Sequence, residues 1–306
     1  MKILVISSNL IGDTILSTGV IEDFSKNNPN AKFTFLIGPT SGQIYEHFPG
    51  LDKIISIKKQ RLNIHWLKMY FKCWHIKWDI VIDLRSSLLS YLLFTKKKYI
   101  FKKNKKLSHI NQLNHLFNIK NSDLFVHTNN NEKSIVEKNL DKNFKYVVIF
   151  PGGNWIPKIW PANQYNELLN ILCYKFTNIK FILVGSLTEK KLYFKKIKAN
   201  IDDNLFIDLM GESLTLTSAY MKKSNLFIGN DSGLMHLAVA SRLSTIGLFG
   251  PTNDNLYGHR TNDCFVIRTK ESYDYFIKTN LDQNKSHMLS IKPNQILDVI
   301  IRNKLL

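Results

Sequence analysis

The sequence predicts an α/β protein of two successive parallel-sheet domains, and three observations support this prediction. Short apolar runs alternate with amphipathic segments along most of the chain, as is typical of repeated βαβ units. A length of 306 residues accommodates two cores of ordinary size. A polar, charged stretch at 129–145 separates one series of alternations from the next. We therefore expect domains at 1–142 and 143–285, with a cleft between them, and a closing helix within 286–306.

The first domain is expected to alternate strands and helices from its first residues. Its clearest strand is the apolar run DIVIDL, and its longest amphipathic segment carries Trp66, Met69, Tyr70 and Trp74. The expected strands are 2–7, 32–37, 53–57 and 79–84, and the expected helices are 14–26, 41–47, 61–75 and 86–94.

The second domain is expected to repeat this alternation. The expected strands are 146–150, 180–184, 205–209, 226–228 and 245–249, and the expected helices are 162–176, 188–199, 214–222 and a segment that ends at Arg242. A closing helix at 293–304 follows from a proline at its start and from Ile296, Leu297, Ile300 and Ile301 at helical spacing.

Composition favours a cytoplasmic protein without a spanning segment. Hydrophobic residues make up 44% of the chain but occur in runs far shorter than the roughly eighteen residues that span a bilayer. The N-terminal apolar run reaches polar Ser7 after a few residues, so it predicts a strand rather than a secretion signal. Cys73, Cys173 and Cys264 are far apart and indicate neither a disulfide framework nor a zinc site.

The formal net charge is +18, and residues 1–145 contribute +12 of it, from 23 Lys and Arg against 11 Asp and Glu. Seven lysines lie close together, namely Lys96, Lys97, Lys98, Lys102, Lys103, Lys105 and Lys106. They form either a solvated, partly strand-like surface or a dock for anionic lipid headgroups or a phosphorylated acceptor. Each lysine near such a surface contributes on the order of 1 kcal/mol. Nucleic-acid binding is a lesser alternative, because the aromatic interleaving of a recognised module is missing.

The first strand is followed by SNLIGDT, residues 8–14. Gly12 permits a tight turn or leaves room for a ligand, and Asp13 lies at or near the start of a helix. Asp13 is therefore either a helix N-cap or a general base, since a carboxylate at the carboxyl edge of a sheet can accept a proton from an attacking hydroxyl.

The first strand of the second domain is followed by PGGNWIPKIWP, residues 151–161. A glycine pair after a strand provides backbone amides that can approach a phosphate, and Lys158 adds a charge. The stretch matches neither of the common nucleotide-binding fingerprints, so its glycines also fit an ordinary turn.

A third strand-turn-helix, LFIGNDSGLMHLAVASRL, places Asp231, Ser232 and His236 near one helix N-terminus. These residues either cap and pack the helix or converge with its amides on an anion. The sequence has no Asp-x-Asp pair, so we expect no metal-bridged diphosphate site and no cofactor; helix amides and lysine would take the metal's place.

Taken in chain order, four stretches carry a family resemblance: MKILVISSNLIGDTILSTGVI, WDIVIDLRSSLLSYLL, VVIFPGGNWIPKIWPANQY with its K-x-W-P, and IGNDSGLMHLAVASRLSTIGLFGPTN. Together they resemble the bacterial lipopolysaccharide heptosyltransferase family, glycosyltransferase family 9. The resemblance implies the GT-B fold, two Rossmann-like domains facing a cleft. It also implies an inverting, metal-independent transfer of heptose from ADP-heptose to a sugar hydroxyl of an anionic, lipid-linked glycan, at the cytoplasmic face of the inner membrane.

The resemblance also implies site residues. Asp13 would be the general base, with Gly12 and Arg85 on the acceptor side. The donor would be bound by Gly152, Gly153, Asn154, Lys158, Gly185, Ser186, Glu189, Met210, Asp231, Ser232, Gly233 and His236. Arg85 and Leu89 stand where family members often carry a glutamine and a basic residue. An alternative keeps the fold and takes another nucleotide sugar and a different glycan or protein acceptor.

Overall fold

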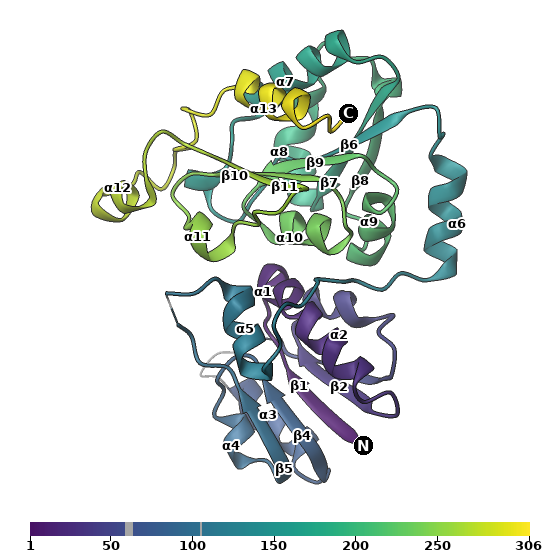
Figure 1. Cartoon of the computed structure of the whole chain (residues 1–306), viewed down its shortest axis with the longest axis vertical. Coiled ribbons are helices and arrows are strands. Elements are labelled where there is room, and N and C mark those ends of the chain that lie inside the picture. Colours follow the sequence, from purple (N-terminus) through teal and green to yellow (C-terminus); the bar gives the residue numbers. More distant parts are fainter. Residues whose placement is uncertain (59–63, 105) are drawn as a thin grey trace. The chain divides into compact units, whose positions relative to one another are not determined.

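The structure is a computed structural model that describes residues 1–58, 64–104 and 106–306. The chain divides into two compact units, Met1–Asn129 and Asn130–Leu306. Each unit has one parallel sheet, which is the predicted fold class (Figure 1).

The first unit has a five-stranded sheet in the order β3-β2-β1-β4-β5. Its central strand is fully buried from Ile3 to Ile6, because βαβ crossovers cover both faces of a parallel sheet. The strands are β1 (Lys2–Ile6), β2 (Lys32–Ile37), β3 (Leu51–Ser56), β4 (Trp78–Asp83) and β5 (Thr95–Ile100), and the helices are α1 (Ile11–Leu16), α2 (Thr18–Lys26), η1 (Ser41–Tyr45), α3 (Ile64–Cys73), α4 (Leu89–Leu92) and α5 (His109–Phe117).

Two expected helices of this unit differ in the structure. The single helix at 14–26 is two helices, because Ser17 ends α1 and its hydroxyl donates to the Thr14 carbonyl at 2.7 Å. The helix at 86–94 shortens to α4, because the buried Asp83 carboxylate accepts from the Arg85 and Ser87 amides and holds the chain in a loop. The start of the expected 61–75 helix and Lys105 lie outside the described residues.

The second unit has a six-stranded sheet in the order β11-β10-β9-β6-β7-β8. The strands are β6 (Lys145–Phe150), β7 (Ile179–Gly185), β8 (Phe206–Met210), β9 (Leu226–Asn230), β10 (Thr245–Phe249) and β11 (Cys264–Arg268). The helices are α6 (Asn130–Asn139), η3 (Ile156–Lys158), α7 (Ala162–Lys175), α8 (Leu187–Lys198), η4 (Asp203–Leu205), α9 (Leu214–Met221), α10 (Gly233–Ala240), α11 (Asp254–Tyr257), α12 (Tyr273–Lys278) and α13 (Pro293–Arg302). Strand β11 and helices α11 and α12 were not predicted.

Helix α6 belongs to the second unit, so the chain divides at 129/130 rather than at the expected 142/143. Val136 of α6 is buried, and the Asn139 amide donates to the Tyr220 hydroxyl of α9 at 2.7 Å. The closing helix α13 likewise packs into this unit, with Ile296 and Ile300 in the same hydrophobic core as β6 and α7.

In both units the order of the strands reverses next to the first strand. The chain proceeds from β1 to β2 and β3 and then returns to β4 on the other side, and it likewise proceeds from β6 to β7 and β8 and returns to β9. At such a reversal the loops at the carboxyl ends of the two central strands diverge, and ligands of α/β proteins bind there. The loops after β1, β4, β6 and β9 are those that carry the motifs.

Candidate functional site

The site in the second unit is built around Asn230, the last residue of β9, which is fully buried. Its side-chain oxygen accepts from the Trp160 amide at 3.0 Å and from the Tyr165 hydroxyl at 3.2 Å. Its side-chain nitrogen donates to the Gly152 carbonyl at 2.8 Å. One side chain therefore fastens both ends of the loop 151–161 to the end of β9. Sequence reasoning missed this residue, although it stands inside the GNDSG stretch.

This connection brings Lys158 to the turn that follows β9. The Lys158 ammonium nitrogen lies 3.9 Å from an Asp231 carboxylate oxygen, and the two side chains are 13% and 9% exposed. Burial raises the pKa of Asp231, and the neighbouring Lys158 charge opposes that rise. This distance is that of an ion pair rather than of a hydrogen bond.

Helix α10 begins at this point. Ser232 is its N-cap and accepts from the Met235 amide at 3.4 Å, and Gly233 is the first helical residue. The capping role considered for Ser232 is therefore present, whereas Asp231 pairs with Lys158 instead of capping. The first amides of an α-helix have no partner inside the helix, so the start of α10 next to Lys158 is a favourable position for a phosphate.

His236 lies one turn into α10 and contacts a second histidine that sequence reasoning missed. His236 Nδ1 and His259 Nε2 are 2.8 Å apart, and the two rings meet edge to face. Burial lowers the pKa of His259 to about 4, so this ring is neutral at neutral pH. The pair fixes the orientation of the His236 ring in the helix.

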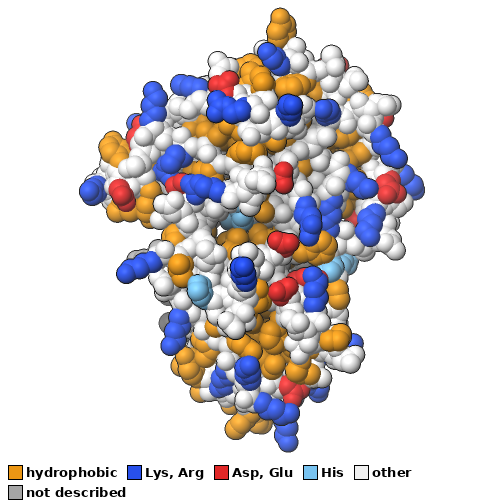
Figure 2. Space-filling view, in the orientation of Figure 1, with side chains coloured by type: hydrophobic (Ala, Val, Ile, Leu, Met, Phe, Trp, Pro, Cys, Tyr) orange, Lys and Arg blue, Asp and Glu red, His pale blue; other side chains and the backbone are white. Residues whose placement is uncertain are grey.

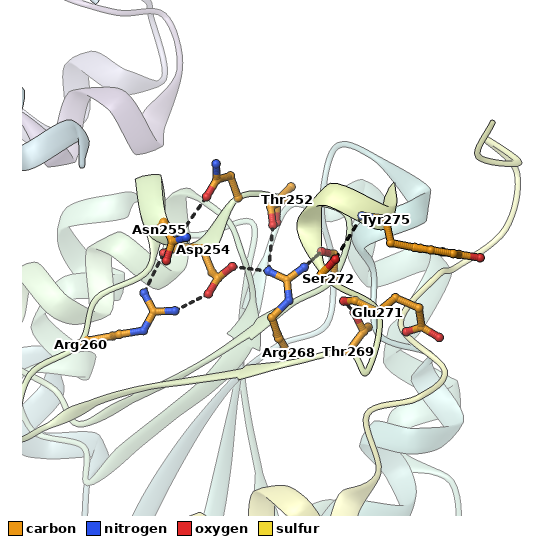
Figure 3. Close-up of polar contacts among 11 residues, drawn as sticks. Thr252, Asp254, Asn255, Arg260, Arg268, Thr269, Glu271, Ser272 and Tyr275 are labelled. Carbon is orange, nitrogen blue, oxygen red and sulfur yellow. Dashed lines mark hydrogen bonds and ion pairs between the residues drawn. The ribbon is translucent and has the colours of Figure 1, made fainter. Parts of the chain in front are cut away.

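A carboxylate holds the loop that carries His259. Asp254 forms ion pairs with Arg260 and Arg268, which approach it from two sides (Figure 3). Arg268, at the end of β11, also donates to the Gly250 carbonyl at 2.5 Å. These contacts connect the ends of β10 and β11 and fix the intervening loop. The sequence offered no signal for this cluster, because Asp254 lies in the unpredicted helix α11, Arg268 lies in the unpredicted strand β11, and Arg260 lies in the loop between them.

The remaining predicted donor residues lie at the ends of β6, β7 and β8. A Cβ on Gly152 would lie 2.0 Å from a Glu189 carboxylate oxygen, and one on Gly185 would lie 2.9 Å from the Met210 methyl. Gly185 has φ +148°, a conformation that favours glycine. Gly152, Gly185, Glu189 and Met210 are therefore neighbours.

Ser186 and Glu189 form a capping box at the start of α8. The Ser186 hydroxyl accepts from the Glu189 amide at 3.2 Å, and the Glu189 carboxylate accepts from the Ser186 amide at 2.7 Å. In the loop after β6, Gly153 packs against Ile159, and Asn154 is exposed.

The site in the first unit surrounds Asp13. Asp13 lies in the first turn of α1 rather than at its N-cap, which is Leu10, and it accepts from the Ser8 hydroxyl at 3.3 Å. Gly12 precedes it in the same turn. From the loop after β4, the Arg85 guanidinium donates to the Asn9 side chain at 3.3 Å.

The charge of Asp13 acts on two neighbouring basic groups. Burial lowers the pKa of Arg85, and the charges of Asp83 and Asp13 oppose this. Burial also lowers the pKa of His109, at the start of α5, and Asp13 again opposes the shift. The Arg85 guanidinium lies 5.2 Å from the centre of the Trp66 ring. The Arg85 guanidinium near Asp13 can bind an anionic group of a ligand that reaches this part of the first unit.

Among the described residues, no cluster of three or more His, Cys, Asp or Glu side chains could hold a metal ion. Within the same ranges, no helix is both long and apolar enough to cross a membrane.

Comparison with known proteins identifies the family. The model of glycosyltransferase family 9 (heptosyltransferase) matches residues 118–280. Lipopolysaccharide heptosyltransferase 1 of Campylobacter coli is 25% identical, with 98% of each chain covered. A family 9 glycosyltransferase from Veillonella parvula superposes with a TM-score of 0.79 at 20% identity over 99% of this chain and 97% of its own. The E. coli heptosyltransferase WaaC with ADP superposes with a TM-score of 0.74 at 16% identity, over 99% of this chain and 100% of its own.

These structures share the two parallel-sheet domains of the GT-B fold with this chain. The family model covers more than half of the sequence and includes the loops after β6 and β9. The chain therefore belongs to glycosyltransferase family 9, the heptosyltransferase family, and is a glycosyltransferase.

Proposed function

We propose that the enzyme transfers heptose from ADP-heptose to a sugar hydroxyl of a lipopolysaccharide-core-type, lipid-linked acceptor, with inversion and without a metal ion. The observation that carries the donor assignment is the position of Lys158 beside Asp231 and the start of α10. Support also comes from relatives named as lipopolysaccharide heptosyltransferases and from the structure of one neighbour with ADP-2-deoxy-2-fluoro heptose.

The proposed reaction is a single displacement. Asp13 accepts the proton of the acceptor hydroxyl as that oxygen bonds to the anomeric carbon of the heptose. The bond between this carbon and the diphosphate oxygen breaks, and ADP leaves with the electron pair. Lys158 and the first amides of α10 stabilise the charge on the departing diphosphate. The proton then passes from Asp13 to solvent.

Two further roles follow for residues near these groups. On the donor side, Gly152, Gly185, Glu189 and Met210 would line the position of the ribose and the adenine, since they are neighbours at adjacent strand ends. On the acceptor side, Arg85 would bind an anionic group of the glycan, since a guanidinium matches phosphate and carboxylate oxygens. We also propose that the enzyme works at the cytoplasmic face of the inner membrane, where a lipid-linked acceptor would lie.

Asp13→Asn tests the assignment of the base. We expect transfer to fall by about 10²-fold or more, while the dissociation constant for ADP in a calorimetric titration stays nearly the same. The exchange should cost little stability, because a carboxylate in a first helical turn contributes only about 0.3–1 kcal/mol. Parallel losses of transfer and ADP binding would assign Asp13 a structural role.

The donor is tested separately by thermal-shift measurements with ADP-, UDP- and GDP-sugars. We expect the ADP-sugars to stabilise the protein most, because relatives of this chain are solved with ADP ligands. Stabilisation by UDP-sugars alone would refute ADP-heptose as the donor and favour another nucleotide sugar.

A further inference from the structure

One surface of the first unit exposes a row of large apolar side chains on α3. Leu67, Phe71 and Trp74 are spaced at four and three residues, so they share one side of the helix, and they are 58%, 58% and 49% exposed. The opposite side of α3 packs into the core through Met69 and Cys73. Helix α3 therefore has two apolar sides, of which the sheet covers only one.

Helix α4 and the residues next to it extend this exposed row. Leu88, Tyr91, Leu92 and Phe94 are between 55% and 78% exposed. Helices α3 and α4 contact each other, and the buried side chains of both belong to one core cluster. We call the seven exposed residues Leu67, Phe71, Trp74, Leu88, Tyr91, Leu92 and Phe94 the α3–α4 patch. Exposed apolar side chains gathered on two contacting helices of a folded domain indicate an interaction site.

Lysines surround the α3–α4 patch. Lys68 and Lys72 are exposed on α3 itself, and the Lys98 ammonium of β5 donates to the Tyr91 carbonyl at 3.4 Å. Residues 64–104 contain nine Lys and Arg but only two acidic residues, Asp79 and Asp83. Asp83 is buried and Asp79 pairs with Lys96, so little negative charge opposes the lysines. Figure 2 shows hydrophobic and basic side chains interspersed over the part of the unit that carries α4 and β5.

The charge decides which partner the patch fits. In a symmetric dimer through the α3–α4 patch, the same lysines of both copies would meet, and like charges across an interface are unfavourable. An anionic bilayer matches both features, because apolar and aromatic side chains enter the boundary between headgroups and acyl chains while lysines bind lipid phosphates. Tryptophan and tyrosine are also the aromatic residues that prefer this boundary.

We propose that the α3–α4 patch docks on an anionic lipid bilayer, with its seven apolar side chains in the interface and Lys68, Lys72 and Lys98 on lipid phosphates. The purpose of this docking rests on the proposed function, because a lipid-linked acceptor is presented at a bilayer surface. It assigns the membrane contact chiefly to helices α3 and α4 rather than to the lysine run alone.

The test is cosedimentation of the full chain with vesicles of phosphatidylglycerol and phosphatidylcholine, and with vesicles of phosphatidylcholine alone. We expect Phe71→Ser/Phe94→Ser to weaken binding to the anionic vesicles at least tenfold. We expect Lys68→Gln/Lys72→Gln/Lys98→Gln to weaken it on the order of fivefold per lysine and to abolish the preference for anionic lipid. All five positions are exposed, so the thermal midpoint should not change.

Matched controls come from the second unit. Tyr174→Ser/Ile277→Ser removes apolar side chains that are 93% and 61% exposed, and Lys191→Gln/Lys195→Gln/Lys196→Gln removes three exposed charges from α8. Both controls should bind vesicles within about twofold of the wild type. The proposal is overturned if the wild type does not bind anionic vesicles, or if patch and control variants bind alike.

A transfer assay separates this proposal from the proposed function. With a delipidated, water-soluble acceptor and no vesicles, the patch variants should transfer as fast as the wild type. Slower transfer under these conditions would contradict a docking role. Binding of wild-type protein to vesicles without any heptosyl transfer would refute the proposed function and leave the docking surface standing.

Discussion

Asn230→Ala should destabilise the second unit and weaken ligand binding at its proposed donor site. The substitution leaves the Trp160 amide and the Gly152 carbonyl, both buried, without their partner, whereas the Tyr165 hydroxyl keeps its bond to the Phe150 carbonyl at 2.9 Å. Each buried polar group left without a partner costs about 1–3 kcal/mol, so we expect a loss of about 2–6 kcal/mol in the free energy of unfolding.

The same bonds hold the loop that carries Lys158, so the affinity for ADP should fall about tenfold or more. Urea denaturation measures the first effect and calorimetric titration with ADP the second. Asn225→Ala is the matched control, because Asn225 accepts from the Tyr146 amide at 2.9 Å at the opposite end of β9. It should cost about 1 kcal/mol and leave ADP affinity unchanged.

Two results would refute this reasoning. The first is a loss of stability for Asn230→Ala no larger than that of Asn225→Ala, which would mean that the buried groups find other partners. The second is unchanged affinity for ADP in the Asn230 variant, which would separate the loop 151–161 from donor binding.

Three further predictions concern the same unit. Gly152→Ala should cost about 1 kcal/mol by forcing Glu189 from its capping box, and Glu189→Ala in the same chain should relieve the clash; additive losses in denaturation would contradict this. Lys158→Met should weaken ADP binding about 10- to 100-fold by calorimetry, since a bond to a charged group is lost and Asp231 remains buried; unchanged affinity would contradict the diphosphate role. Burial lowers the pKa of His259 from 6.5 to about 4, so the stability that its neutral form contributes is complete above pH 6.5 and is lost as the pH falls toward 4. His259→Asn should reduce this loss of unfolding free energy at acid pH by up to about 3 kcal/mol. Identical profiles of stability against pH for the variant and the wild type would refute the buried, neutral state of His259.

Local sequence patterns predicted most strands because a buried parallel strand is a short apolar run between turn residues. Strand β9, fully buried from Leu226 to Asn230, is such a run. Strand β11 was missed because it lies at the edge of the sheet and only two of its five residues, Cys264 and Ile267, are buried. Helix α4 was predicted too long because hydrogen bonds to Asp83 override the helical pattern.

The candidate site was likewise predicted in part from local sequence and missed in part. Sequence placed Asp13, Lys158 and Ser232 in loops that follow strands, and the sheet order brings Lys158 and Ser232 to the end of β9 in the second unit. Sequence did not identify Asn230 or His259, because their roles depend on partners far along the chain. The Asn230 side chain binds Gly152 across 78 positions.

The sequence by itself determined the succession of βαβ units, the residues of the three motifs and the excess of positive charge. These are properties of short segments and of composition, and they do not depend on how the segments pack. The tertiary structure alone decided that Asn230 fastens the loop of Lys158, that His259 contacts His236, and that α6 packs with the second unit. It also decided which apolar side of α3 faces the core and which remains exposed, because helical periodicity identifies apolar sides, whereas only packing against the sheet covers one of them.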